Sequence, residues 1–285
     1  TIAPLLSQTQ SDNKMAAPNP ALSSIDSPAR QQAFDVTVIA MKHEIERRNT
    51  IENNLSAIGL RFRFIDGLNY DETTTCKIKL GYRKEMSVKT IQRELTAPEI
   101  GCFVSHREAW IQASRKNRPT LILESDALLD SESVEIIERL CNQAAHHDLV
   151  MLNYHKCIPS FWKRSAINSR YSLVKFANRR VHCLASYLVS PEGARKLADQ
   201  ASTFYLTADD YATGGYIDKD IDLFAVFPRC VSMSHLADQS TIEEARQEAS
   251  KRTKNPDKNK ASLFRKIELY LRNLRRALLP PSKGL

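Results

Sequence analysis

The sequence predicts an α/β fold with a mostly parallel central sheet. Short runs rich in Val, Ile and Leu alternate with longer segments of helical periodicity, and this alternation is typical of strands joined by helices. At 285 residues the chain is long enough for one or two domains and a sizeable core. Its longest apolar runs are far too short to cross a bilayer, and we find no signal-peptide pattern.

A single folded domain is predicted over residues 34–245. Residues 1–33 are rich in Ser, Ala, Pro, Gln and Asn, a composition that predicts disorder. Residues 34–40 form a β-rich run and the first predicted strand. Residues 43–59 place apolar side chains near one helical face and end at a glycine, which is a common helix stop. Residues 61–65 alternate as a second strand would, and an Asp-Gly turn signal follows.

The strongest helix signal lies in the middle of the domain. Residues 70–95 are polar and irregular, which predicts a surface or active-site loop. Next come a capping threonine, Thr96, a proline suited to the first turn, and Glu99, which completes a capping box. A helix should therefore run to about Lys116, and the apolar strand that follows should end at Glu124.

The remaining elements continue the alternation of helices and strands. We find no internal repeat. The predicted elements are a helix near 131–145, strands at 148–153 and 186–190, a helix that starts at Pro191, and a late strand at 221–227 that Pro228 ends.

The positive charge of the chain is concentrated near its C-terminal end. Residues 251–285 hold 11 Lys and Arg against 2 Asp and Glu, which leaves 30 basic and 31 acidic residues in the first 250. The body is therefore near neutral, and no nucleic-acid partner is expected. Residues 246–260 are charged and predict a linker. Residues 261–279 predict a basic amphipathic helix, which suits an anionic membrane surface or, alternatively, docking on the body.

The cysteine pattern argues against a zinc module. The six cysteines are scattered and form no Cys-x-x-Cys pair, so the usual spacing of zinc ligands is absent. Reduced thiols in a reducing compartment are the default interpretation.

An acidic pair closes the predicted central strand. Glu124 and Asp126 follow the apolar run 120–123, and side chains two residues apart in a strand point the same way. Open α/β sheets place ligands at the carboxyl ends of their strands, so the pair could converge on a hard cation such as Mg²⁺. The alternative is an ordinary strand end followed by a polar turn.

Five blocks of the chain, in the right order, resemble glycosyltransferase family 25, which includes lipooligosaccharide β-galactosyltransferases. Residues 95–110 (LTAPEIGCFVSHREAW) resemble the family's LtpgEiGCxlSHxxxW block. Residues 121–126 (LILESD) stand where the family has an apolar strand ending in Glu-Asp-Asp. The other similar blocks are 38–48, 185–190 and 207–211, and the resemblance covers about residues 35–242.

The resemblance implies a GT-A (Rossmann-like) fold and an inverting transfer of a hexose that gives a β-linkage. It implies a UDP-sugar donor, UDP-galactose or UDP-glucose, together with Mn²⁺ or Mg²⁺. The expected acceptor is a lipooligosaccharide, a lipopolysaccharide or a related glycan or glycolipid. With the basic C-terminal segment, we expect a cytoplasmic protein that is peripheral on the inner face of the cytoplasmic membrane.

The resemblance also implies roles for the acidic residues. Asp126 is the expected direct metal ligand, with Glu124 assisting, and His235 could add a ligand after the last strand. Asp209 or Asp210 is expected to act as the general base, and helix capping is their alternative role.

Further polar residues are expected at the donor. Ser125 replaces the family's usual Asp: its hydroxyl could hydrogen-bond to the donor, but loss of a needed metal ligand would weaken activity. Arg47 and Arg48 could face the nucleotide phosphates or pair on the surface. Ser105 and His106 are expected to border the donor, although a lone histidine on an apolar helical face is often a core residue.

Two other classes of function remain open from the residues alone. A metal-dependent phosphohydrolase or nucleotidyltransferase also places carboxylates at strand ends. A non-catalytic relative that binds glycans or membranes would explain Ser125 as a mark of lost activity.

Overall fold

The computed structural model describes residues 32–69, 81–142, 147–155, 157–177, 181–214, 220–238 and 241–252, together with Leu271. All of them belong to one compact unit, Gln31–Leu285. Several predictions lie wholly or mostly outside the described residues: the N-terminal segment 1–33, the first part of the loop 70–95, and the helix 261–279.

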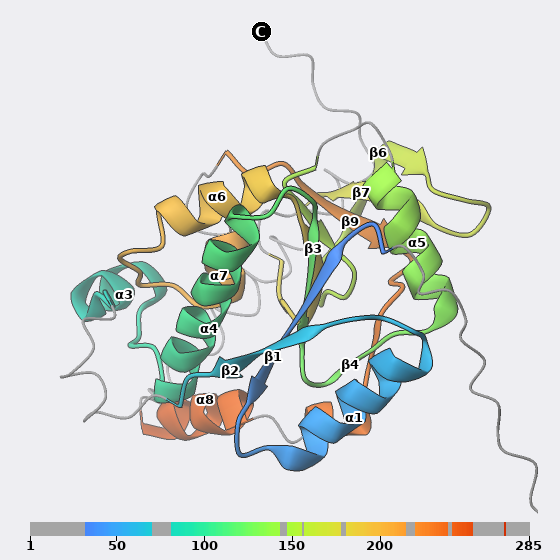
Figure 1. Cartoon of the computed structure of the whole chain (residues 1–285). Coiled ribbons are helices and arrows are strands. Elements are labelled where there is room, and N and C mark those ends of the chain that lie inside the picture. Colours follow the sequence, from blue (N-terminus) through green and yellow to red (C-terminus); the bar gives the residue numbers. More distant parts are fainter. Residues whose placement is uncertain are drawn as a thin grey trace, which may run out of the picture. The chain divides into compact units, whose positions relative to one another are not determined.

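Among the described residues, eight strands form one sheet in the order β2-β1-β3-β8-β5-β9-β7-β6 (Figure 1). Strand β1 is parallel to β2 and β3, and β5 is parallel to β9, whereas β8 and β7 run antiparallel to their neighbours. All these strands except β8 and β7 therefore point one way, which confirms the predicted mostly parallel sheet. The bounds are β1 (Asp35–Met41), β2 (Arg63–Gly67), β3 (Thr120–Glu124), β5 (Leu149–Met151), β6 (Pro159–Ala166), β7 (Ser172–Phe176), β8 (Ser186–Val189) and β9 (Leu223–Phe227).

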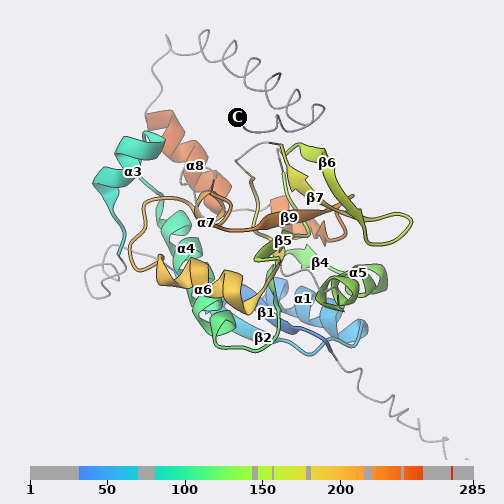
Figure 2. The same ribbon diagram turned by 90° about the horizontal axis from the view of Figure 1, so that it is seen from above.

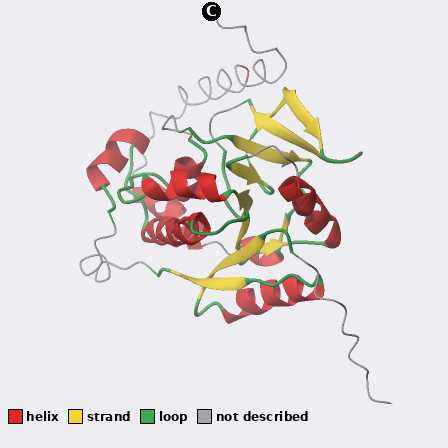
Figure 3. Cartoon of the chain, turned by 45° about the horizontal axis from the view of Figure 1, so that its top comes forward, coloured by secondary structure: helices red, strands yellow, loops and turns green. Residues whose placement is uncertain are grey.

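Helices cover both faces of this sheet (Figures 2 and 3). Alternate side chains of β3 show the division, since Ile122 joins the core with α4, α6 and α7, while Leu121 and Leu123 join the core with α1 and α5. This two-faced burial agrees with a Rossmann-like fold. The helices are α1 (Ile45–Ala57), α3 (Lys84–Ile91), α4 (Ala97–Ser114), α5 (Ser131–Asn142), α6 (Pro191–Asp199), α7 (Ala208–Ala212) and α8 (Thr241–Arg252).

A short two-stranded ribbon lies beyond the main sheet. Strand β4 (Ala127–Leu128) pairs antiparallel with β10 (Ser232–Met233), and the 3₁₀ helix η1 (His235–Asp238) follows. Ser234 N donates to Asp126 O at 2.7 Å, so the late part of the chain lies against the turn that ends β3. The segment that follows the ribbon thus contacts the turn that carries Asp126.

Helix α4 begins as its capping signal predicts. Thr96 and Glu99 form a capping box, with Pro98 in the first turn. Thr96 N donates to Glu99 Oε2 at 2.8 Å. The helix turns Phe103, His106 and Trp110 inward, and all three are almost fully buried.

Some predicted boundaries were wrong. Asp66 and Gly67 are the last residues of β2, paired with Ala40 and Met41, rather than a turn. Helix α3 lies within the predicted loop 70–95. Ser87 is the one buried residue of this helix, so its sequence carries no buried apolar stripe that would have predicted it. Residues 246–252 of the predicted linker are helical, as the end of α8.

Among the described residues, no helix combines the length and the apolar character needed to cross a membrane.

Candidate active site

A pocket of about 390 Å³ lies at the carboxyl ends of β1, β2 and β3. Ligands of open α/β sheets bind at this edge because the loops that follow the strands diverge there. The wall combines the acidic turn after β3, the loops after β1 and β2, one face of α4, and Ile242 of α8. Its polar and small side chains include His43, Glu44, Arg47, Asn69, Gly101, Cys102, Ser105, His106, Glu124, Ser125 and Asp126.

The predicted acidic pair meets in this pocket. Glu124 ends β3 and Asp126 lies in the turn before β4, and both side chains line the cavity. Asp126 Oδ1 is buried and has no hydrogen-bond partner among the described residues, while Oδ2 lies 3.5 Å from Arg47 Nη1. Burial raises the pKa of Asp126 well above its usual range; the charge of Glu124 adds to the shift and Arg47 opposes it.

This donor set suits a hard divalent cation. Two carboxylates and one guanidinium line the same pocket, and the pKa of Asp126 is raised mainly by burial. An orphaned buried carboxylate oxygen is a ready ligand for Mg²⁺ or Mn²⁺, which prefer oxygen. Asp126 and Glu124 are therefore the residues that could hold such an ion. Ser125 is buried between them and also lines the pocket.

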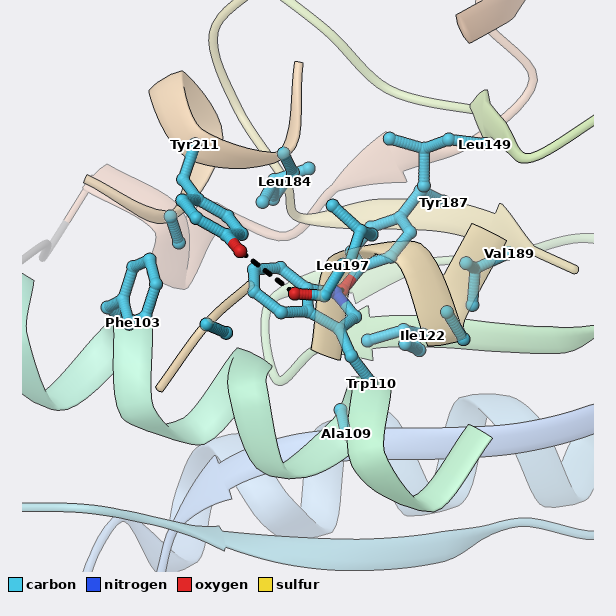
Figure 4. Packing of buried hydrophobic residues seen from close by; sticks show 14 of the residues in the cluster. Phe103, Ala109, Trp110, Ile122, Leu149, Leu184, Tyr187, Val189, Leu197 and Tyr211 are labelled. Atoms are coloured by element: carbon cyan, nitrogen blue, oxygen red, sulfur yellow. Dashed lines mark hydrogen bonds between the residues drawn. The ribbon is translucent and has the colours of Figure 1, made fainter. Parts of the chain in front are cut away.

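His106 is buried as a core histidine would be, and it also lines the pocket. The ring is 1% exposed, and its Nε2 lies 3.1 Å from Glu124 Oε1. Its Nδ1 lies 2.9 Å from Tyr187 Oη, which also accepts a hydrogen bond from Trp110 Nε1 at 2.8 Å (Figure 4 shows Trp110 and Tyr187 facing one another). The acidic pair is thus connected to the core of the domain.

Ser105 lines the pocket through a structural contact. Its Oγ accepts a hydrogen bond from Leu68 N at 2.9 Å and donates to Gly101 O at 2.7 Å. These bonds hold the loop after β2 against α4, so the side chain shapes the wall of the pocket.

The two adjacent arginines of α1 have different positions. Arg47 lines the pocket, where its Nη2 donates to Leu236 O at 2.7 Å. Arg48 is not part of the lining: it donates to Ala40 O and Met41 O, pairs with Asp66, and lies over the Phe64 ring. Of the two, Arg47 can reach a ligand, whereas Arg48 ties α1 to β1 and β2.

Asp209 and Asp210 also separate into two roles. Asp210 is 2% exposed and accepts from the Thr207 hydroxyl at 3.2 Å at the start of α7, where Thr207, rather than either aspartate, is the N-cap: its side chain accepts from Asp210 N. Asp209 Oδ2 lies 3.7 Å from His182 Nδ1 and accepts from Cys183 N at 3.5 Å. Asp209 is therefore the member of the pair that faces the loop before β8.

The ionisation of Asp209 is set by its neighbours. Burial raises the pKa of Asp209, but hydrogen bonds with His182 and Thr207 and the charge of Arg246 outweigh burial and lower it overall. Burial raises the pKa of the Cys102 thiol, and the charges of Glu124 and Asp209 raise it further. Cys102 lines the pocket, so Asp209 is close to the site although it is not in the wall.

His235 does not join the acidic pair in the pocket. Its side chain is exposed and is absent from the pocket wall, although Ser234 and Leu236 on either side contact Asp126 and Arg47. Among the described residues, the three potential ligands that come within 4.8 Å of one another are Cys102, His106 and Glu124.

Sequence reasoning missed a clamp beside the pocket. Glu99, with a side chain 1% exposed, accepts two hydrogen bonds from Arg93 and one from Arg246 Nε, each of 2.7 Å. Arg246 lies on α8, whose Ile242 lines the pocket, so the clamp holds this wall against α4. The capping box marked Glu99, but nothing local pointed to a partner 147 residues away.

Comparison with known proteins finds related sequences in one family. The family model described as "Glycosyltransferase family 25 (LPS biosynthesis protein)" matches residues 34–212. A "Glycosyltransferase 25 family member" of Drosophila melanogaster is 27% identical over 179 residues, which cover 57% of this chain and 27% of the relative. "Procollagen galactosyltransferase 1-B" of Xenopus laevis is 28% identical over 184 residues, which cover 60% and 29%. The chain spans less than a third of the length of these relatives. The matched segment contains the acidic pair, the α4 block and Asp209, and the chain belongs to glycosyltransferase family 25.

Proposed function

We propose that this protein is an inverting hexosyltransferase that moves galactose from UDP-galactose to a glycan, with UDP-glucose as the second candidate donor. The observation that carries the proposal is the pair of carboxylates, Glu124 and Asp126, in a pocket at the carboxyl edge of the sheet of a family 25 glycosyltransferase. The name of the Xenopus relative, a galactosyltransferase, supports the choice of sugar. A lipooligosaccharide or related surface glycan is the acceptor that we propose.

The pocket would bind the diphosphate end of the donor. We assign Glu124 and Asp126 to a divalent cation, Mn²⁺ or Mg²⁺, which when bound neutralises charge on the UDP leaving group. Arg47 adds a guanidinium to the same wall, 3.5 Å from Asp126, and such groups suit phosphate oxygens. The buried Ser125 hydroxyl offers a neutral hydrogen bond where the family has a carboxylate.

Asp209 is our candidate for the general base. In a single displacement the acceptor oxygen bonds to the anomeric carbon while the bond from that carbon to the UDP oxygen breaks, and the acceptor proton passes to the base. The lowered pKa keeps Asp209 ionised at neutral pH, which leaves it able to accept this proton. The same shift makes it a weaker base than a carboxylate with a pKa near 7.

Two further cavities are where we propose that the acceptor enters. They measure about 450 and 530 Å³ and share His155 and Arg229. His155 N donates to His182 O at 2.9 Å, and the His182 ring contacts Asp209. His182 therefore links His155, in the wall of both cavities, to the candidate base.

The direct test is release of UDP by the purified full chain. Incubation with UDP-galactose, Mn²⁺ and a lipooligosaccharide acceptor should release UDP and extend the acceptor, and EDTA should abolish the reaction. Asp126→Asn should lower kcat/KM by about 100-fold or more, because it removes a charged ligand of the proposed ion. Absence of UDP release with every common sugar nucleotide, from folded protein, would refute the proposal. Hydrolysis of the donor without transfer would favour a phosphohydrolase.

A further inference from the structure

We propose that Trp110, Tyr187 and His106 form a directional hydrogen-bond relay that fixes the His106 tautomer and so positions the Glu124 carboxylate. The relay begins in the core and ends at the pocket. Its three bonds measure 2.8 Å from Trp110 Nε1 to Tyr187 Oη, 2.9 Å from that oxygen to His106 Nδ1, and 3.1 Å from His106 Nε2 to Glu124 Oε1. The first three side chains are at most 1% exposed.

The donor chemistry gives the relay its direction. An indole N–H can only donate, so the Tyr187 oxygen is the acceptor of the first bond. The single hydroxyl proton of Tyr187 is then directed to its other partner, His106 Nδ1, which must present a lone pair. A neutral imidazole with a lone pair on Nδ1 carries its proton on Nε2, and that proton points at a carboxylate oxygen. Every donor in the chain meets an acceptor.

The opposite tautomer would break the chain at two points. A proton on Nδ1 would leave the buried Tyr187 hydroxyl proton without this acceptor, and the Nε2 lone pair would face a carboxylate oxygen. An imidazolium would donate from both nitrogens and leave the same hydroxyl proton without this acceptor. The relay thus assigns one tautomer by satisfying all its members.

This assignment separates two interpretations of the cluster formed by Cys102, His106 and Glu124. Their potential ligand atoms lie within 4.8 Å of one another, which suits a metal held by sulfur, nitrogen and oxygen. A metal on His106 would need the Nε2 lone pair, yet the relay places a proton there. His106 is therefore a donor to Glu124 and a positioning residue.

Positioning of Glu124 is the consequence for the pocket. The Glu124 side chain is 32% exposed and lines the cavity, while its partner His106 is buried behind it. A hydrogen bond to Oε1 restricts rotation of the carboxylate, so the group is presented to the cavity in one orientation. The role of this orientation in binding a cation and a sugar nucleotide rests on the proposed function. The assignment of the tautomer does not depend on that function.

The first experiment reads the tautomer directly. Full-length protein labelled with ¹⁵N-histidine, free of metal and donor, should show the His106 ring protonated on Nε2 and unprotonated on Nδ1; a His106→Gln spectrum assigns the signals. Tyr187→Phe should move the Nδ1 resonance toward that of a nitrogen without a hydrogen-bond donor. A wild-type proton on Nδ1, or on both nitrogens, would overturn the relay.

Tyr211→Phe is the matched control. Tyr211 is also buried, its ring stacks on Trp110, and its hydroxyl donates to Leu197 O at 2.9 Å rather than to His106 (Figure 4). Both variants lose one buried hydroxyl and should lose similar thermal stability. The Tyr211→Phe protein should keep the wild-type His106 signals, and equal changes of these signals in both variants would mean a general loosening of the core.

The second experiment reads the positioning. Calorimetric titration with Mg²⁺ and UDP should show affinity about tenfold weaker in Tyr187→Phe and unchanged in Tyr211→Phe, since groups that orient metal ligands have effects of this size. His106→Gln, which can still donate to Glu124, should keep more affinity than His106→Leu. If the wild-type protein shows the expected tautomer but the two tyrosine variants bind Mg²⁺ with equal affinity, the positioning role is wrong. Absence of transferase activity would instead count against the proposed function and leave the spectrum standing.

Discussion

Adjacent residues in this protein have separate roles, and the two aspartates of α7 are the clearest case. Asp210 is buried against Thr207, the N-cap of the helix, while Asp209 contacts His182 and Cys183 near the pocket. The sequence shows two equivalent carboxylates there. Their difference arises because successive residues at a helix start project about 100° apart, so only one can face the loop before β8.

These roles predict different losses. Asp209→Asn should lower kcat by about 100-fold or more, because it removes the proposed proton acceptor. It should also lower the free energy of unfolding, because the contacts that lower the pKa of Asp209 stabilise its charged form in the fold. Asp210→Asn should instead leave kcat nearly unchanged and destabilise the fold by about 1 kcal/mol, because it weakens the buried hydrogen bond from the Thr207 hydroxyl. Initial rates of UDP release and urea unfolding of both variants separate the two effects. Equal activity of Asp209→Asn and wild type would remove Asp209 from the mechanism.

A substitution at Ser125 shows how the acidic turn responds to a further negative charge. A third carboxylate beside Glu124 and Asp126 would add repulsion in a pocket where the pKa of Asp126 is already raised. Ser125→Asp should therefore lower the Tm in EDTA, and Mn²⁺ should raise its Tm more than that of wild type. Differential scanning calorimetry with and without Mn²⁺ provides the measurement. A large gain in transferase activity in this variant would show that the natural chain is impaired, as the non-catalytic alternative requires.

At the scale of elements, α8 joins the domain through one buried carboxylate. Burial raises the pKa of Glu99, but hydrogen bonds from Arg93, Thr96 and Arg246 outweigh burial and lower it overall. A carboxyl group whose pKa is lower in the folded state stabilises the fold above the unfolded pKa, near 4.5. This stabilisation is lost as the pH falls from about 4.5 through the folded pKa.

Glu99→Gln should therefore lower the free energy of unfolding by about 2 kcal/mol at pH 7, because charge-assisted hydrogen bonds from two partly exposed arginines are weakened. The deficit should shrink below pH 4.5, where wild-type Glu99 becomes protonated.

Glu94→Gln is the control: Glu94 pairs with Lys84 at 2.9 Å, but both side chains are more than half exposed. That change should cost less than about 1 kcal/mol. Urea unfolding at pH 7 and pH 3.5 distinguishes the two, and a Glu99 deficit independent of pH would contradict the clamp.

Elements with strong local signals were predictable, and elements without them were not. Helix α4 has a capping box and β3 an unbroken apolar run, and both appear within two residues of their predicted ends. Helix α3 carries no buried apolar stripe, and β7 is a short run after an irregular segment, so the formation of the β6–β7 hairpin depends on contacts such as the pairing of β7 with β9.

At the scale of the whole molecule, charge separates a near-neutral body from a basic C-terminal segment, residues 251–285. We propose that this segment holds the protein at the inner face of the cytoplasmic membrane, close to a lipid-linked acceptor. The full chain should pellet with vesicles that contain phosphatidylglycerol and not with neutral vesicles, and high salt should release it. Replacing Arg272, Arg275 and Arg276 by Gln should weaken binding about 100-fold, at about 1 kcal/mol for each charge. Equal pelleting with neutral vesicles would refute this role.

The sequence by itself determined the elements with strong local signals, such as α4 and β3, and it placed Glu124 and Asp126 at the end of a buried strand. Those features follow from periodicity and capping, which act over a few residues. The tertiary structure alone decided the partners: Arg47 beside Asp126, Tyr187 behind His106, and Arg246 on Glu99. These pairs join residues 79, 81 and 147 positions apart, so they exist only once the sheet and its helices have packed together.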